Sequence, residues 1–542
     1  MRRIGVLVVA AVVLFAMMPG AQQRLPPAPA GAAPAIRGVI HVHTTRSDGT
    51  GSVDDVVRAA ASAGLRFVIV TDHGDGTRTP DLPDYRRGVL YIDAVEISTT
   101  NGHLVALGLP KSPYPLAGDA RDVIEDVHRM GGLAIAAHPG SPRRELQWTD
   151  WTVPLDGLEW LNADSAWRDE QPWTLARVLL TYPFRPPQAL ALLLDRPEPV
   201  MQRWDELSRQ RPVFGVPGAD AHARVGVRSL GEPYDTAGSL HFPSYANSFR
   251  EFSFTLPDVA LTGDAVADAR TVLDAIGRGA FYSTIDALAG PAALRVSASS
   301  GRLRVNAQAP DAARVVLFRN GTVVATATGG TLERDVDAAV YRVEVMLPGA
   351  PGRPPVPWMV SNPIYLTSLP EAAPADQTST VAKTVTTIDD GGSAGAWTIE
   401  KSTDSDAVID VIPALPGAQL LFRFAISGSA ADSPYAAFVR AATPAIGMYD
   451  RLLFTARANR PMRISVQLRG GAEGERWRRS VYLDQSPRTV DLRFADFRPT
   501  SGVSTDPPVL SRVESMLFVI DTVNTKIGSN GQIQIDDIRY AR

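Results

Sequence analysis

Four stretches decide the fold of the first half of this chain: VIHVH (residues 39–43), FVIVTDH (67–73), LAIAAHP (133–139) and VFGVPGADAH (213–222). Each is a short run of apolar, often β-branched residues that ends in polar side chains, as a buried strand does where it meets a loop. Helical patterns separate the runs. Strands that alternate with helices over residues 37–286 predict βα units, and therefore a parallel sheet or barrel.

Two of the intervening helices have boundaries that the sequence marks. Ser52, with Asp55 three residues later, is typical of a helix N-terminus, and Gly64 is typical of the position after a helix end. A second helix is predicted to begin at Asp119 and to end at Gly131.

Six of the eight histidines fall where a predicted strand begins or ends. In a βα barrel the carboxyl ends of the strands open on one face, so residues far apart in sequence converge there. The i, i+2 spacing of His41 and His43 predicts side chains on the same side of an extended backbone. Asp220 and His222 repeat that spacing. We expect one cluster, made of His41, His43, Asp48, His73, Glu96, His103, His138, Asp220 and His222.

Imidazole nitrogens and carboxylate oxygens are common metal ligands. The cluster has more ligands than one ion takes, since zinc binds about four and manganese about six. We therefore expect two or three divalent ions, with Glu96 bridging them. Of the other histidines, His128 lies on a predicted helix and is interpreted as a solvated side chain, whereas His241 either lines the pocket or has no role in it.

The motifs HVHTTRSDG, VTDHG, the segment from Glu96 to His103, AAHPG and GADAH resemble, in this order, those of the polymerase and histidinol phosphatase (PHP) family of metallohydrolases. The resemblance covers about residues 37–285. It implies a distorted (β/α)7 barrel that binds manganese, iron or zinc. It also implies that His41, His43, Glu96 and Asp220 hold one ion, Glu96 and His138 a second, and Asp48, His73 and His222 a third, with His103 on the second or third.

The expected reaction is attack by a metal-bridged hydroxide on phosphorus or on a carbonyl carbon. Glu96 and Asp220 are the predicted catalytic carboxylates. Asp72 is a further candidate, either as a residue that orients an imidazole or as an ordinary acid at a strand end. For binding substrate we favour four residues near the motifs, Arg143, Arg224, Trp148 and Trp151.

The stretch from 139 to 219 is longer than one βα connection needs and holds six of the nine tryptophans. We expect an inserted helical lid or wall. Trp160, in the strand-like GLEWLN, is expected in the core, and Trp148 and Trp151 in an aromatic pocket wall.

The N-terminus has the order of a secretory signal peptide over residues 1–21: two arginines, an apolar run and small residues. An uncleaved anchor is the alternative. Residues 22–36 form a Pro/Ala-rich linker. We expect an exported protein, periplasmic or secreted, with no membrane span in the mature chain. The absence of cysteine excludes disulfides, and a net charge of -4 gives no field that favours nucleic acid.

The second half of the chain shows short alternating strands. Residues 290–367, with the hairpin signal Asn320-Gly321, predict a small β-sandwich similar to the one that follows PHP barrels in exported members. Residues 368–395 are a predicted linker. Residues 396–542 resemble galactose-binding-like sandwiches, whose loops hold carbohydrate in some proteins; a structural role is the alternative.

Three functions follow as hypotheses. The first is a phosphoesterase that acts on a small or glycan-linked phosphate ester. The second is a hydrolase of carboxylic esters or carbamates on the same metal site, since the chain also resembles the carbaryl-hydrolase branch of the family. The third is a carbohydrate-binding protein with a vestigial barrel, although none of the expected ligands is missing.

Overall fold

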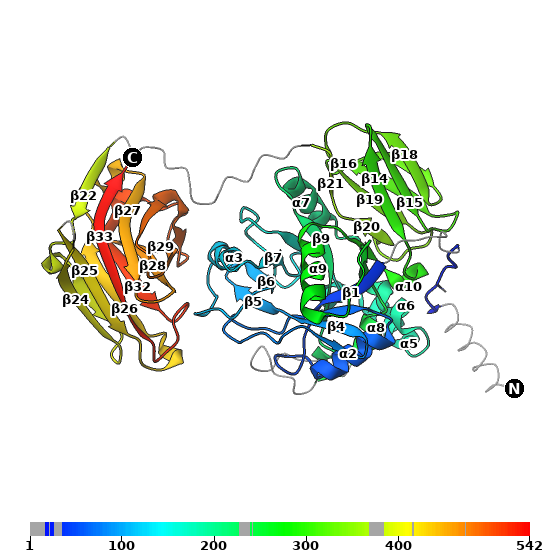
Figure 1. Cartoon of the computed structure of the whole chain (residues 1–542), viewed down its shortest axis with the longest axis horizontal. Coiled ribbons are helices and arrows are strands. Elements are labelled where there is room, and N and C mark those ends of the chain that lie inside the picture. Colours follow the sequence, from blue (N-terminus) through cyan, green and yellow to red (C-terminus); the bar gives the residue numbers. More distant parts are fainter. Residues whose placement is uncertain are drawn as a thin grey trace. The chain divides into compact units, whose positions relative to one another are not determined.

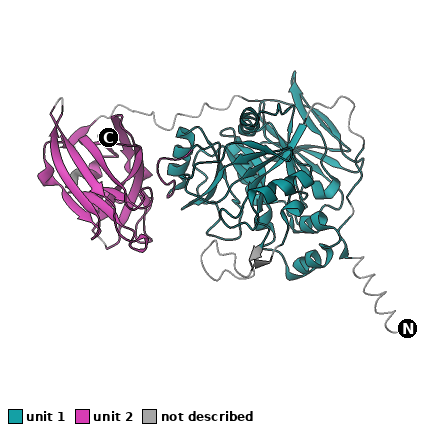
Figure 2. Cartoon of the chain, turned by 60° about the horizontal axis from the view of Figure 1, so that its bottom comes forward, with its two compact units in different colours: residues 1–110, 119–372 teal, residues 111–118, 373–542 magenta. Residues whose placement is uncertain are grey.

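The computed structural model describes residues 17–20, 22–26, 35–226, 239–240, 242–367, 384–414, 417–471 and 473–542. Most of the predicted signal peptide and of both linkers, as well as His241, lies outside these residues. The chain divides into two compact units, Met1–Pro110 with Asp119–Ala372, and Lys111–Gly118 with Ala373–Arg542 (Figure 2). Within the described residues, no helix has both the length and the apolar character that crossing a bilayer requires.

The first unit contains a closed ring of strand pairings (Figure 1). Strand β1 (Ala35–Val42) is parallel to β2 (Phe67–Val70) and to β9 (Phe214–Ala221), and β9 is parallel to β8 (Gly157–Asn162). Strand β8 is parallel to β7 (Leu133–Ala136). Strands β6 (Gly102–Leu107) and β5 (Val95–Thr99) follow in antiparallel pairings. A parallel bridge between His73 and Glu96 closes the ring from β5 back to the end of β2.

The ring differs from the expected parallel arrangement at one side. The run VLYIDAVEIS divides into β4 (Val89–Asp93), which is parallel to β2, and β5, which forms an antiparallel hairpin with β6. Strand β3 (Asp84–Arg86) pairs with β4. Glu96 therefore lies within β5 and not at the end of a strand.

Helices lie between the ring strands where the capping signals predict them. Helix α2 (Val53–Ser62) begins with a capping box of Ser52 and Asp55, and Gly64 follows it with φ +72°. Helix α3 (Ala120–Arg129) has Asp119 as its N-cap, and Gly131 follows with φ +82°. Both predictions are confirmed. Such caps mark helix ends because they satisfy backbone groups that the helix leaves unpaired.

The long stretch between β7 and β9 is a helical insertion around strand β8. After β8 come α4 (Ala163–Ala166), α5 (Pro172–Thr181), α6 (Pro186–Leu190) and α7 (Glu198–Ser208). Farther along, α8 (Tyr245–Ser248) precedes β12 (Ser253–Pro257), and α9 (Ala265–Gly277) packs its Val272 and Ile276 into the core beneath the ring.

Residues 290–367 do not form a separate sandwich. One three-stranded sheet contains β14 (Leu294–Ser299), β15 (Arg302–Ala307) and β18 (Thr331–Asp335). The other has the order β17 (Thr322–Thr328), β16 (Arg314–Arg319), β19 (Val340–Met346) and β20 (Met359–Ser361). It continues through β13 (Tyr282–Thr284) and β12 to β1. Shared backbone hydrogen bonds thus make this sheet continuous with the ring.

Side chains reinforce that junction. The amide of Asn362 accepts a hydrogen bond from the backbone N–H of Gly215 (2.7 Å) and donates one to the carbonyl of Phe281 (3.1 Å). Trp358 is buried and donates to the carbonyl of Gly290 (3.2 Å). The predicted hairpin at Asn320-Gly321 is confirmed: both residues have positive φ, as a two-residue turn of the mirror-image type requires.

The second unit is a β-sandwich, as predicted. One sheet contains β22 (Val385–Asp389), β24 (Asp406–Pro413), β25 (Ala418–Ala425), β33 (Asn530–Ala541), β27 (Arg451–Ala458) and β30 (Arg488–Arg493). The other contains β23 (Thr398–Lys401), β26 (Tyr435–Ala441), β32 (Val513–Asp521), β28 (Met462–Gly470), β29 (Arg476–Leu483) and β31 (Arg498–Pro499). Phe422 and Phe438, from opposite sheets, stack with ring centroids 4.1 Å apart in the shared core. Strand β22 begins inside the predicted linker, so the sandwich is longer than expected.

Candidate metal centre

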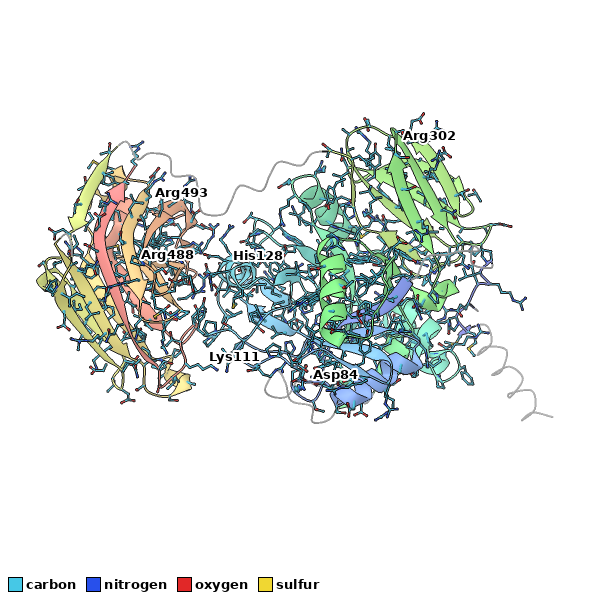
Figure 3. The ribbon with its side chains drawn as sticks, viewed as in Figure 1. Asp84, Lys111, His128, Arg302, Arg488 and Arg493 are labelled. Atoms are coloured by element: carbon cyan, nitrogen blue, oxygen red, sulfur yellow. The ribbon has the colours of Figure 1, made fainter. Side chains whose placement is uncertain are left out.

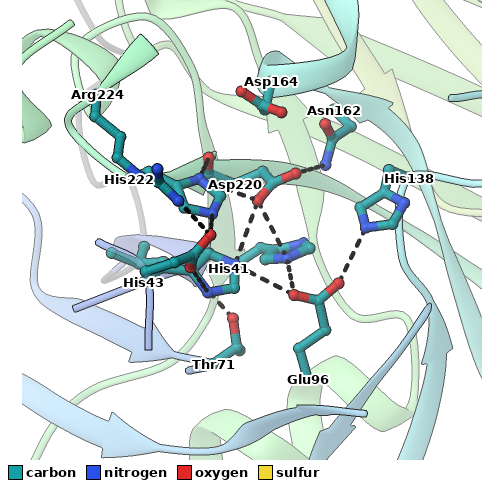
Figure 4. A network of polar contacts seen from close by, with 12 residues as sticks. His41, His43, Thr71, Glu96, His138, Asn162, Asp164, Asp220, His222 and Arg224 are labelled. Atoms are coloured by element: carbon teal, nitrogen blue, oxygen red, sulfur yellow. Dashed lines mark hydrogen bonds and ion pairs between the residues drawn. The ribbon is translucent and has the colours of Figure 1, made fainter. Parts of the chain in front are cut away.

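The structure brings all nine predicted ligands into one cluster at the strands of the ring, and six of them are buried, whereas His73, His103 and His222 are partly exposed. Figure 4 shows six of them by label, with His41, His43 and Asp220 facing Glu96 from neighbouring strand ends. Four overlapping sets of side chains have ligand atoms close enough to share an ion: His41, His43 and Glu96; His41, His138 and Asp220; His73, Glu96 and His103; and His43, Asp48, His73 and His222.

The carboxylate of Glu96 lies at the centre of the cluster. Its Oε2 is 3.1 Å from His41 Nε2, 3.2 Å from His43 Nε2 and 3.2 Å from His73 Nδ1. Its Oε1 is 2.8 Å from His103 Nδ1 and 3.0 Å from His138 Nε2. One carboxylate therefore faces five imidazoles, which is the position expected for a bridging ligand.

Two further carboxylates flank this centre. Asp220 Oδ1 lies 3.4 Å from His41 Nε2 and 3.3 Å from His43 Nε2. Asp48 Oδ2 lies 3.1 Å from His222 Nε2 and 2.7 Å from Arg224 Nη2. Because two ligands of one tetrahedral ion, each about 2.1 Å from it, are about 3.4 Å apart, these separations suit ligands that share a cation.

The backbone conformation of these ligands differs from the one that the i, i+2 spacing of His41 and His43 predicts. His41 has φ +66°, and the pairing of β1 with β9 shifts register between Ile40 and Val42. The side chains of His41 and His43 do converge, but not because the strand is extended. His138 (φ +30°) and Asp220 (φ +43°) also have left-handed backbones. Such conformations are costly for residues with a Cβ, and they cluster at functional sites.

Three imidazoles have their tautomers set by acceptor-only oxygens. Nδ1 of His41 lies 2.5 Å from Glu159 Oε1, Nδ1 of His138 lies 3.2 Å from the carbonyl of Leu146, and Nδ1 of His222 lies 2.8 Å from the carbonyl of Asp220. Since these oxygens only accept, each Nδ1 carries a proton. Each Nε2 then faces a carboxylate oxygen, at 3.0–3.1 Å. A neutral imidazole would present a lone pair to that oxygen, so each pair needs either a proton on Nε2 or a metal ion that both atoms bind.

Buried atoms at the centre fit the same conclusion. His41 Nε2, His43 Nε2 and Glu96 Oε2 are buried and make no hydrogen bond. Leaving such atoms unpaired is expensive, and nitrogen and oxygen donors are those that zinc, manganese and iron accept. The residues present therefore fit a group of divalent metal ions.

The charges of the cluster depend on one another. Burial opposes the charged form of each group and is the largest single influence, but opposite charges outweigh it for most of them. The carboxylates of Asp220 and Glu96, which lie 3.3 and 3.2 Å from its Nε2, raise the pKa of His43 to about 10. The imidazoles of His73 and His41 hold the pKa of Glu96 well below its usual range. At His73 burial prevails and lowers the pKa to about 4.

The sequence analysis missed Glu159 and Asn162 on strand β8. Glu159 is buried, and Gly218 on β9 leaves room for it, since a Cβ there would lie 2.0 Å from Oε1. Asn162 Nδ2 donates to Glu159 (2.8 Å) and to Asp220 (3.2 Å). A charged residue inside the apolar run GLEWLN was the available signal, because carboxylates are rarely buried without a partner.

Asp72 lies beside the cluster with hydrogen bonds to a neighbouring turn. Its Oδ1 accepts from the backbone N–H of Thr44 and from Ser47 Oγ, both at 2.7 Å, and its Oδ2 accepts from Thr44 Oγ1. Ser47 Oγ is in turn 3.4 Å from His43 Nδ1. Asp72 therefore holds the turn after β1 and reaches an imidazole through Ser47.

The predicted substrate residues have different positions. Arg224 lies at the cluster, paired with Asp48. Arg143 is exposed on the turn after His138. Trp148 does not line a pocket: it is 2% exposed and donates to the carbonyl of Asp150. Trp151 is half-buried and lies under the guanidinium of Arg203.

Two other sequence interpretations have clear outcomes. Trp160 belongs to the core, as predicted, and donates to Ser283 Oγ (3.0 Å). His128 lies on α3 (Figure 3) with its side chain 35% exposed, as predicted, and its Nε2 lies 2.8 Å from Asp156 Oδ2.

The chain is thus a multi-domain protein, mostly of β-sheet, whose first unit carries side chains that could hold metal ions. No protein-family model matches the chain. An uncharacterized protein of Methanocaldococcus jannaschii, MJ1587, is 31% identical to it over 139 residues, which are 23% of this chain and 80% of that protein. The chain belongs to the same family as that archaeal protein, whose name states no activity.

Solved structures of carbohydrate-binding modules are also similar to part of the chain. A family 11 module from Clostridium thermocellum, in complex with a β-1,3-1,4-mixed-linked tetrasaccharide, has a TM-score of 0.24 at 16% identity and covers 29% of this chain and 94% of its own. A family 30 module from a cellulosomal cellulase of the same organism has a TM-score of 0.22 at 10% identity, over 29% of this chain and 96% of its own.

Proposed function

We propose that this chain is a metal-dependent hydrolase of the PHP type and that it acts as a phosphoesterase. The observation that carries the proposal is the set of three imidazoles, His41, His138 and His222, whose Nε2 atoms face carboxylate oxygens at 3.0–3.1 Å while their Nδ1 protons are held elsewhere. An arrangement in which lone pairs face each other is stable only around cations, either protons or metal ions.

The topology supports the same assignment. We infer that the closed ring from β1 to β9 is the distorted (β/α)7 barrel of this family. In that arrangement the ligands come from strand ends and from the loops that follow them, as His43, His138 and Asp220 do.

The ligand sets support two or three ions. One ion would lie among His41, His138 and Asp220 and another among His43, Asp48, His73 and His222, with Glu96 and His103 available to a further or shared ion; the family resemblance differs in grouping His43 with His41 and His138 with Glu96. When bound, divalent ions lower the pKa of a coordinated water and offset negative charge on a phosphoryl oxygen.

The chain's own residues supply position and charge. The side chains of Glu96, His41 and His43 are at most 1% exposed, so bulk water is excluded from the centre. Arg224 is 12% exposed and lies at the side of the cluster formed by Asp48 and His222, where a guanidinium can donate to an anionic group. A cationic donor beside the site favours a phosphate ester over a neutral carboxylic ester.

Metal analysis of the purified chain, paired with a substrate panel, tests this proposal. We expect at least two ions per chain and manganese-stimulated hydrolysis of aryl phosphates or phosphodiesters. Asp220→Asn should lose this activity while keeping its fold by circular dichroism, and Asp335→Asn on exposed strand β18 is the matched control. Fewer than two ions per chain contradicts the metal centre. Turnover of aryl esters or carbamates alone contradicts the phosphoesterase and supports the second hydrolase hypothesis.

Export and carbohydrate binding remain predictions from the sequence. Amino-terminal sequencing of the protein recovered from the periplasm or medium tests cleavage near residue 21. Glycan-array binding by the full chain that persists in His41→Ala, with no hydrolysis of any substrate by the wild type, would instead support a carbohydrate-binding protein.

A further inference from the structure

The candidate ligands fall into two groups with different surroundings. The inner group is His41, His138 and Asp220, and the outer group is His43, Asp48, His73 and His222. The inner side chains are 0%, 4% and 7% exposed. In the outer group, His43 is 0% and Asp48 8% exposed, whereas His73 and His222 are 12% and 13% exposed, so only the outer group includes side chains that reach solvent to this extent.

Backbone conformation separates the groups as well. All three inner ligands have positive φ, at 66°, 30° and 43°. None of the four outer ligands, each within the described residues, has positive φ. A left-handed conformation persists in a residue with a Cβ only when its surroundings hold it there.

Glu159 is what holds the inner group. Its Oε1 accepts from His41 Nδ1 (2.5 Å), and its Oε2 accepts from the backbone N–H of His138 (2.7 Å). The third inner ligand is reached through Asn162, whose Nδ2 donates both to Glu159 Oε2 (2.8 Å) and to Asp220 Oδ2 (3.2 Å). One buried carboxylate, which does not face the shared centre itself, therefore fixes the tautomer of His41, the backbone of His138 and the carboxylate of Asp220.

The neighbouring strand leaves room for this carboxylate. Gly218 pairs with Asn162 in the β8–β9 register and adjoins the Glu159 side chain, so a Cβ there would be 2.0 Å from Oε1 and 2.2 Å from Cδ. Since the side chain is fixed by three donors, it cannot move aside without losing its hydrogen bonds to the ligands. The absence of a side chain at Gly218 is therefore needed for Glu159 to hold the ligands.

We infer that Glu159 is a positioning residue that makes the inner group a preorganised, tight metal site and leaves the outer group as a weaker, exchangeable one. The inference rests on the proposed metal centre. Acceptors that orient ligating imidazoles raise metal affinity by about 10- to 100-fold, and a ligand set that is already in place loses less freedom on binding. The outer ion would be the one that leaves first under mild chelation.

Competition for Zn²⁺ between the full chain and a chromogenic chelator tests this inference. The wild type should show at least two affinity classes. In Glu159→Gln one amide oxygen must serve donors that two carboxylate oxygens serve now, so the tight class should weaken about 10- to 100-fold while the weak class keeps its affinity. Gly218→Ala should have the same selective effect. Glu333→Gln, an exposed substitution on strand β18, should change neither class.

The outcomes separate this inference from the proposed function. If the wild type binds no Zn²⁺, the proposed metal centre itself is contradicted. Two classes in the wild type that remain unchanged in Glu159→Gln, or that weaken equally, overturn the role of Glu159. If both variants fail to fold, nitrogen-15 NMR of the histidines in the Zn²⁺-loaded wild type decides: His41 should carry its proton on Nδ1, and a proton on Nε2 contradicts the inference.

Discussion

Arg224 donates a hydrogen bond to Asp48 across 2.7 Å, and the two residues are 176 positions apart in the sequence. Asp48 also faces His222 at 3.1 Å, so the guanidinium lies at the more exposed side of the metal cluster. This pairing keeps a cation beside the site without placing it among the buried ligands.

Replacement of Arg224 should therefore weaken substrate binding more than chemistry. We expect Arg224→Gln to raise KM for a phosphate ester at least about 10-fold, because a charge-assisted hydrogen bond is lost, and to change kcat less. Steady-state kinetics with measured metal content checks this. An unchanged KM at full metal occupancy contradicts a role in substrate binding. Arg143→Gln, on an exposed turn, is the comparison variant: the same measurement of KM shows whether the other predicted arginine also binds substrate.

Glu96→Gln should remove metal and activity together. An amide at the position that faces five imidazoles lacks the negative charge that a bridging ligand provides. We expect a loss of at least one ion per chain and of at least about 100-fold in activity, measured by metal analysis and turnover. A variant with full metal content would mean that the ions lie elsewhere.

Metal binding should release protons at neutral pH. Without metal, His43 has a pKa of about 10 and the pKa of His41 lies well above its usual value, so both imidazoles are protonated at pH 7. Because a ligating nitrogen must be deprotonated, metal affinity should rise with pH up to about 10. Calorimetric titrations with Zn²⁺ in buffers of different ionisation enthalpy check this, and an enthalpy independent of buffer contradicts it.

A buried carboxyl outside the ligand cluster, Glu251, should make the stability of the fold depend on pH. Burial raises the pKa of Glu251 to about 8, above the value of about 4.3 in an unfolded chain. The folded state thus binds more protons between these values, so the stability from protonated Glu251 is present below about pH 4.3 and is lost as pH rises through about 8. Glu251→Gln should make the unfolding free energy less dependent on pH from 5 to 8. Parallel denaturation curves for both proteins over this range would contradict the prediction.

The hairpin of residues 320–321 offers a test of the sheet that extends from the ring. Gly321 has φ +84°, and a Cβ there would lie 3.0 Å from the Cβ of Asp205, which the guanidinium of Arg342 holds in place. Gly321→Ala should destabilise the first unit by about 1 to 2 kcal/mol. Gly349→Ala has a similar φ (+71°) with nothing within 4 Å, so it isolates backbone strain. Equal melting temperatures for the two variants would exclude the contact with Asp205.

Capping residues and hairpin glycines were predictable because they act through neighbours in the sequence. Ser52 caps α2 with its own first turn, and Gly321 needs a positive φ whatever surrounds it. The pairing of β20 with β13 was not predictable, since the residues of a strand do not specify which distant strand will lie beside it. For the same reason the domain expected at residues 290–367 is part of a larger sheet.

The sequence by itself determined which residues could make the metal cluster, because histidines and carboxylates at the ends of apolar runs are costly unless they are used. Only the tertiary structure decided how they are held. The left-handed backbone of His41 and the path from Glu159 through Asn162 to Asp220 depend on strands β1, β8 and β9 lying side by side. The space beside Gly218 also depends on β8 and β9 lying side by side. The type of a residue fixes the chemistry of its own side chain, whereas hydrogen bonds between distant strands form only when the chain folds.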